Sequence, residues 1–126
     1  SAKLFEDSEK AHPLREEEMI PVERIVGRLV AIGAEDDSLW DTAKYIRRME
    51  KRLADRPHAC ETEFYVYKHG THFVFPQSLM KTMLPVGADW MVKLAFKAAR
   101  TYPKECRETR IDIDRRICPA IETWRA

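Results

Sequence analysis

The sequence predicts an α/β fold in which about two parallel strands are flanked by helices. Residues 25–32 form a nearly continuous apolar run, the pattern of a strand that is covered on both faces. A helical period follows over about residues 41–54, and β-branched and aromatic residues are then concentrated at residues 62–67. A strand, a helix of this length and a second strand indicate a right-handed crossover in a parallel sheet.

Local signals mark the ends of these elements. Gly33 is expected to end the first strand. Asp41 or Ser38 can cap the following helix, because either side chain can accept hydrogen bonds from its free amide groups. That helix is expected to end at about Arg56-Pro57, since proline disfavours helix in the residue before it.

The 126 residues are expected to form a single partial domain with three parts. Residues 1–20 are a polar connecting segment, residues 21–76 contain the strand-helix-strand unit, and residues 77–126 form a helical tail. Because a two-stranded sheet exposes long edges, either more strands lie in sequence outside this chain or another copy covers the edges. The tail is expected to contain helices over 78–83, 87–102 and about 104–124, broken at Pro85, Pro103 and Pro119.

Composition argues against several classes of function. The formal net charge of +1 lacks the basic excess of a nucleic-acid-binding surface. No apolar run approaches the roughly 18 residues that a membrane-spanning helix needs, so we expect a soluble, cytoplasmic protein without a membrane partner. Three widely spaced cysteines fit neither a disulfide framework nor a metal site, and we expect them to be reduced structural thiols.

Two polar segments follow the predicted strands, at residues 33–40 and 69–76. Catalytic groups of open parallel sheets gather just beyond the carboxyl ends of the strands, so Asp37 and His72 are expected on the same rim. A buried carboxylate that accepts Nδ1–H of histidine fixes its tautomer and leaves Nε2 free to take a proton. The pair therefore predicts a general base that acts on a nucleophile or a substrate.

These segments resemble the α/β-hydrolase superfamily, in which the nucleophile, the acid and the histidine follow in that order along the chain. The segment Asp36-Asp37-Ser38-Leu39-Trp40 is similar to the acid loop of the acyl-CoA thioesterase and bile acid-CoA:amino acid N-acyltransferase C-terminal family. The segment Gly70-Thr71-His72-Phe73 is similar to the histidine loop of that family, and Ile20 to Ile25 also fits. The resemblance covers about residues 18–80 and is shared in part with dienelactone-type hydrolases.

The resemblance implies roles for individual residues. Matched on Trp40, Asp37 takes the role of the catalytic acid and His72 that of the base; counting from Gly33 favours Asp36 instead, which stays an alternative. His69 is expected to be a neighbour without a role. The resemblance also implies that the chain is the C-terminal fragment of a doubly wound parallel-sheet α/β-hydrolase that needs no metal or organic cofactor.

A nucleophile elbow, Gly-x-Ser-x-Gly or its cysteine variant, does not occur in the chain. We therefore expect the chain to supply the triad acid and histidine of a serine-type hydrolase or acyltransferase, and to be inactive alone. The substrate of the full-length protein would be a small-molecule ester or acyl thioester. The alternative is a non-enzymatic hydrolase-like module that forms homo-oligomers, or binds another subunit, through exposed strand edges.

Overall fold

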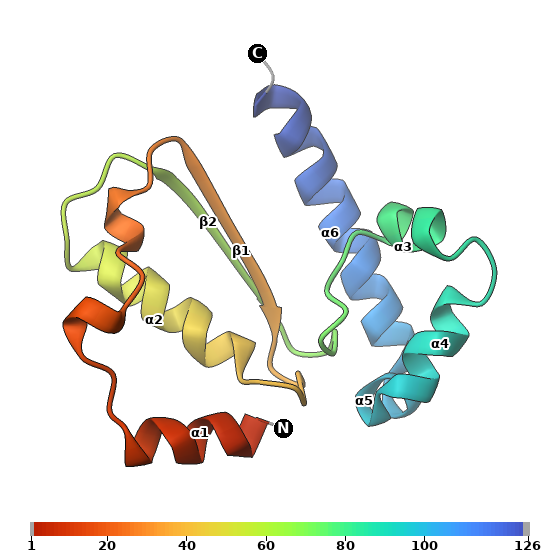
Figure 1. The fold of residues 1–126 in the computed structure, drawn as a ribbon. Coiled ribbons are helices and arrows are strands. Elements are labelled where there is room, and N and C mark those ends of the chain that lie inside the picture. Colours follow the sequence, from red (N-terminus) through yellow and green to blue (C-terminus); the bar gives the residue numbers. More distant parts are fainter. Residues whose placement is uncertain (1, 125–126) are drawn as a thin grey trace.

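The computed structural model describes residues 2–124, and its sheet consists of two parallel strands (Figure 1). Strand β1 (Arg28–Ala34) pairs with β2 (Glu61–Tyr67) along its whole length, from Arg28 opposite Glu61 to Ala34 opposite Tyr67. Helix α2 (Thr42–Ala54) connects the two strands. The predicted strand-helix-strand crossover and the α/β fold class are therefore confirmed.

Strand β1 is shifted along the sequence from the expected range. Val26 precedes the strand and is 86% exposed, because a turn at Gly27, with φ of +98°, separates it from the sheet. Gly33 does not end the strand. A Cβ atom at Gly33 would lie only 2.7 Å from the Cδ1 atom of Ile46, so the missing side chain allows α2 to pack directly on the strand.

Helix α2 packs on one face of the sheet, and side chains of the C-terminal helix α6 (Pro103–Trp124) contact the other face. Successive side chains of a strand point to opposite faces. Leu29 and Phe64 accordingly pack in the apolar cluster that contains Leu53 of α2. Tyr67 points the other way and donates a hydrogen bond of 2.8 Å to Asp112 of α6. This layering explains why the strands are rich in apolar residues.

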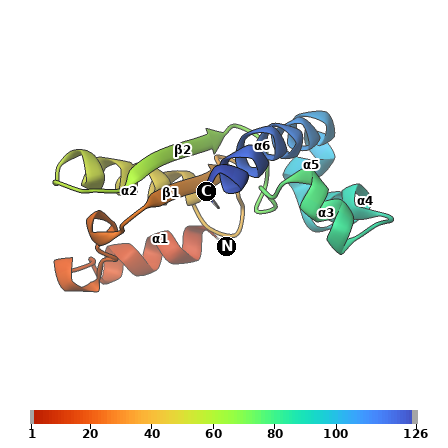
Figure 2. The ribbon, with the colours of Figure 1, turned by 90° about the horizontal axis from the view of Figure 1, so that it is seen from above.

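Residues 77–102 of the helical tail lie beyond the carboxyl end of the strands (Figure 2), whereas α6 runs back beside the sheet, where Thr123 accepts a hydrogen bond from Arg28 of β1. Residues 87–102 do not form one helix as expected, because Phe96 is extended, with φ of −125°, and buries its ring against Val92 and Cys106. Pro119 does not break the helix but lies within α6. Its position is exposed, so solvent can bind the carbonyl group that proline leaves without a hydrogen bond. The other helices are α3 (Gln77–Met83), α4 (Ala88–Ala95) and α5 (Lys97–Thr101).

The N-terminal segment packs against α2 and the loop that follows β1. It contains α1 (Ala2–Ala11) and the short 3-10 turns η1 (Glu16–Glu18) and η2 (Val22–Arg24). Glu9 of α1 forms ion pairs with Lys44, at 2.8 Å, and with Arg48 of α2. Within residues 2–124, no helix combines the length and the apolar character needed to cross a lipid bilayer.

Candidate functional site

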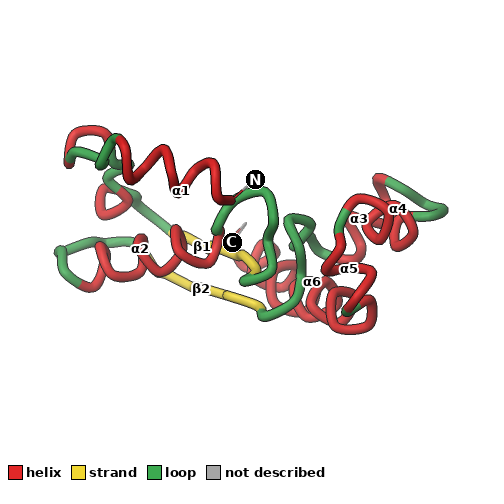
Figure 3. The backbone as a smooth tube through the Cα atoms, turned by 90° about the horizontal axis from the view of Figure 1, so that it is seen from below, coloured by secondary structure: helices red, strands yellow, loops and turns green. Residues whose placement is uncertain are grey.

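Two loops leave the sheet at the same end because the strands are parallel (Figure 3). We call residues 35–41, after β1, the acid loop, and residues 68–76, after β2, the histidine loop. The amide of Glu35 donates a hydrogen bond of 2.8 Å to the carbonyl oxygen of Tyr67, so the chains stay paired just beyond the strands. The first residues of both loops are thereby held side by side.

Asp37 and His72 are in direct contact between these loops. The Oδ2 atom of Asp37 lies 2.9 Å from Nδ1 of His72, while Oδ1 accepts a hydrogen bond of 2.9 Å from the amide of Leu39. The Asp37 side chain is 1% exposed, whereas that of His72 is 25% exposed. A buried carboxylate on Nδ1 orients the ring and leaves Nε2 as the nitrogen that can exchange a proton with a partner.

Aromatic side chains limit the movement of the imidazole. The ring of Trp40 meets that of His72 edge to face, with centroids 4.6 Å apart and planes at 79°. Trp40 also contacts Phe5 of α1, at a centroid distance of 6.0 Å. The centroid of the Phe73 ring lies 6.4 Å from that of His72. Trp40 and Phe73 therefore pack beside the imidazole of His72.

Asp36, the alternative acid, is engaged elsewhere in the histidine loop. Its carboxylate accepts hydrogen bonds from the amides of Gly70 and Thr71, and it lies 3.1 Å from Nδ1 of His69. The geometry therefore pairs Asp37, and not Asp36, with His72. The Asp36–His69 contact was not expected from the sequence. Asp36 and His69 are 33 residues apart, close to the 35 residues between Asp37 and His72, and this similar spacing could have indicated the contact.

None of the described cysteines is placed as a catalytic nucleophile. Cys60 and Cys106 are buried, and burial raises the pKa of the Cys106 thiol to about 11, so it stays protonated at neutral pH. Cys118 is exposed on α6, where its hydrogen bond to Asp114 raises the pKa of the thiol. All three are free, as the sequence predicts.

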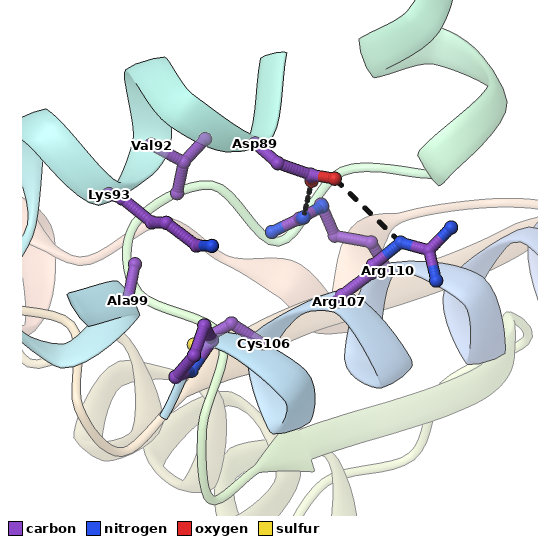
Figure 4. Close-up of a pocket in the computed structure, with 8 residues that line it drawn as sticks. Asp89, Val92, Lys93, Ala99, Cys106, Arg107 and Arg110 are labelled. Carbon is purple, nitrogen blue, oxygen red and sulfur yellow. Dashed lines mark hydrogen bonds and ion pairs between the residues drawn. The ribbon is translucent and has the colours of Figure 1, made fainter. Parts of the chain in front are cut away.

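A polar cluster fixes the helical tail beside the site (Figure 4). Arg110 of α6, whose side chain is 3% exposed, donates hydrogen bonds to Asp89 of α4 and, at 2.7 Å, to Gln77 of α3. Arg107 lies 3.7 Å from Asp89, and these groups line a cavity of about 50 Å³ together with Cys106. Because one buried guanidinium connects three helices, the cluster stabilises the tail on which the histidine loop rests.

The acid loop and the histidine loop lie in a region that matches a known protein family. Residues 3–88 match the family model described as BAAT / acyl-CoA thioester hydrolase C terminal. The chain belongs to this family. The match extends beyond residues 18–80, which carry the resemblance in the sequence, and it contains both loops of the site. Searches of curated proteins and of solved structures found no match.

Membership of the BAAT / acyl-CoA thioester hydrolase C-terminal family makes the chain a domain of the thioester hydrolase and acyltransferase type. In this C-terminal domain the match includes α1, both strands and α3, and ends at Ala88, the first residue of α4. Helices α5 and α6 lie outside the matched region. The family assignment and the Asp37–His72 contact are thus independent observations on the same part of the chain.

Proposed function

We propose that this domain supplies the acid, Asp37, and the base, His72, of a catalytic triad that acts on an ester or acyl thioester. The observation that supports the proposal is the contact of 2.9 Å between the buried Asp37 carboxylate and Nδ1 of His72. The parallel strands present this pair at the end of the sheet where α/β enzymes carry their catalytic groups. The order of the acid before the histidine is that of the α/β-hydrolases.

In the proposed reaction, Nε2 of His72 takes the proton from the hydroxyl group of the nucleophile as its oxygen bonds to the acyl carbon. Asp37 stabilises the imidazolium that results. His72 then gives the proton to the departing thiolate or alkoxide as its bond to the acyl carbon breaks. In the second half, His72 deprotonates the acceptor, which is water in hydrolysis or an amine in acyl transfer, as the acceptor bonds to the acyl carbon. The bond between the acyl carbon and the nucleophile oxygen then breaks, and His72 returns the proton to that oxygen.

The nucleophile of the proposed triad comes from polypeptide outside these 126 residues. The described serines do not lie in a Gly-x-Ser-x-Gly motif. Nor do the cysteines offer a substitute, because Cys60 and Cys106 are buried and Cys118 donates a hydrogen bond to Asp114 on α6. Donors for the oxyanion that forms on the acyl group are likewise assigned to that outside part.

A second candidate function is association without catalysis. In a two-stranded sheet, each strand has one edge whose amide and carbonyl groups pair with no other strand of residues 2–124. Such edges can pair with a second copy of the chain or with another subunit. A mass that corresponds to a monomer at all concentrations of the purified chain, measured by sedimentation, would exclude self-association through these edges.

The enzymatic proposal is tested in the full-length polypeptide that contains this chain. We expect His72→Ala to lower the turnover of a 4-nitrophenyl ester and of an acyl-CoA thioester by about 10⁴-fold or more. The matched control is His58→Ala, because His58 is exposed and its ring contacts the Arg56 carbonyl far from the histidine loop. Near-normal turnover of the His72→Ala variant would remove His72 from the mechanism.

A further inference from the structure

Asp36 holds the histidine loop through contacts that do not involve the Asp37–His72 pair. Its Oδ1 atom accepts hydrogen bonds from the backbone amides of Gly70, at 3.0 Å, and Thr71, at 2.8 Å. Its Oδ2 atom lies 3.1 Å from Nδ1 of His69. Hydrogen bonds to an ionised carboxylate are stronger than those between neutral groups, so these contacts fix the histidine loop relative to β1.

The two amides surround the carboxylate because of an unusual backbone turn. Thr71 is fully buried and has φ of +62°, in the left-handed region that β-branched residues rarely adopt. Consecutive amides next to a left-handed residue form a concave site for an anion. The Asp36 carboxylate is the anion here. It therefore stabilises the backbone conformation of the residue directly before His72.

His69 anchors the same loop on its opposite side, against the helical tail. Its ring stacks on that of Tyr102, with centroids 3.9 Å apart and planes at 23°. Its carbonyl oxygen accepts a hydrogen bond from the hydroxyl group of Thr109 in α6. The imidazole is thus held between Asp36 and Tyr102, and it connects the acid loop to the tail.

We propose that Asp36 and His69 form a second carboxylate–imidazole pair, which positions His72 against Asp37. The proposal rests on the proposed function, in which His72 is the catalytic base. Asp36 is a positioning residue, since it acts through the backbone of residues 70–71 and touches no reacting atom. The two adjacent aspartates then have different tasks: Asp37 orients the imidazole, and Asp36 holds the loop that carries it.

Three substitutions separate the contributions of these contacts. Asp36→Ala removes both carboxylate oxygens that contact His69 and the amides of Gly70 and Thr71. Asp36→Asn keeps a carbonyl oxygen for the two amides but loses the negative charge and the second carboxylate oxygen. His69→Ala removes the stacked ring and leaves the amide bonds intact. We expect the largest effect on His72 from Asp36→Ala, and smaller effects from the other two.

The test is nitrogen NMR of the 126-residue chain with labelled histidines. In the unsubstituted chain, we expect the His72 proton to stay on Nδ1, bound to Asp37 and protected from exchange with water. In Asp36→Ala this protection should be lost, and the amides of residues 70 and 71 should exchange at least about tenfold faster. Glu35→Gln is the matched control, because Glu35 is the adjacent carboxylate but is half exposed and pairs with Arg47.

An Asp36→Ala variant that keeps both the protected Nδ1 proton of His72 and the amide exchange rates would overturn the proposal. If circular dichroism shows that this variant is unfolded, the comparison moves to Asp36→Asn. There, weaker protection of the His72 proton than in Glu35→Gln supports the proposal, and equal protection overturns it. Neither NMR result depends on turnover. Whether His72 takes part in catalysis is decided separately, by the turnover of the His72→Ala variant of the full-length polypeptide.

In the full-length polypeptide, Asp36→Ala should lower kcat by about tenfold to a hundredfold with little change in KM, because the base is misplaced while substrate contacts remain. A change confined to KM would contradict positioning. If His72→Ala leaves turnover intact, the proposed function fails, whereas the NMR result on loop geometry still decides whether Asp36 orders His72.

Discussion

The Nδ1 atom of His72 lies 2.9 Å from Oδ2 of Asp37, although 35 positions separate the two residues in the sequence. The contact forms because β1 and β2 are parallel neighbours, so the loops that follow them meet at one end of the sheet. Asp37 is almost fully buried and also accepts the amide of Leu39, which fixes the direction of its carboxylate. The ring of His72 is therefore oriented by a group that itself has little freedom.

Asp37→Asn is expected to abolish most catalysis with little effect on the fold. The amide has nearly the same shape, but it carries no charge and can favour the wrong tautomer of the imidazole. We expect turnover by the full-length polypeptide to fall by about 10⁴-fold at neutral pH. The control is Asp55→Asn, since Asp55 is exposed and pairs with Lys51 at the end of α2. Equal losses in the two variants would argue against a special role for Asp37.

The sequence was sufficient to predict the elements that carry the site. The apolar run, the helical period and the β-rich segment are local patterns, and the order strand-helix-strand then determines that the strands are parallel. The choice between Asp36 and Asp37 depended on whether to count from Gly33 or from Trp40. The structure explains why Trp40 is the better reference: Gly33 lies within β1, whereas Trp40 belongs to the acid loop and contacts His72.

Other features depend on tertiary packing and left no clear local signal. The interruption at Phe96 occurs in a helix-favouring segment and follows from the burial of one ring among the tail helices. Pro119 is tolerated within α6 because that turn is exposed, a property that the sequence does not show. The amides of Gly70 and Thr71 meet the Asp36 carboxylate at a left-handed turn, which a threonine does not favour by itself.

Gly70→Ala should destabilise the domain and disturb the histidine loop. A Cβ atom at this position would lie 2.6 Å from Cγ1 of Val74 and 3.1 Å from Cβ of Ala34, the last residue of β1. Overpacking of this kind costs about 1–3 kcal/mol of unfolding free energy. Thermal and urea unfolding measure the loss. In Gly27→Ala the same methyl group meets no atom within 4 Å, so only the cost of its positive φ applies.

The exposure of the cysteines predicts the reactivity of each thiol. We expect Cys118 to react first with 5,5′-dithiobis(2-nitrobenzoic acid) in the folded chain, because it is exposed whereas Cys60 and Cys106 are buried. Cys106 should stay unreactive even in mildly alkaline solution, since burial raises the pKa of its thiol to about 11. All three should react in guanidinium chloride. Cys118→Ser is the control, and any fast reaction that it retains would contradict the burial of the other two.

The N-terminal segment should detach from α2 at acidic pH, because a carboxylate holds it there. Arg52 donates two hydrogen bonds, of 2.6 and 2.8 Å, to the carboxylate of Glu23, and Arg56 donates a third. The hydrogen bonds of Arg52 lower the pKa of Glu23 from 4.5 to about 2. A carboxyl group whose pKa is lower in the folded state stabilises the fold above pH 4.5, and this contribution is lost as the pH falls towards about 2.

Glu23→Gln should therefore destabilise the chain at neutral pH and flatten the loss of stability between pH 4.5 and about 2. Urea unfolding at a series of pH values measures this dependence, and hydrogen exchange of η2 reports whether the segment opens. Glu50→Gln is the matched control, since Glu50 is exposed on the same helix as Arg52 and forms no ion pair in the part of the chain that the structure describes. If the unfolding free energy of both variants depends on pH as it does in the unsubstituted chain, the Glu23–Arg52 pair does not hold the N-terminal segment. The segment is then attached by the apolar contacts of Val22 with Leu53 and Cys60 instead.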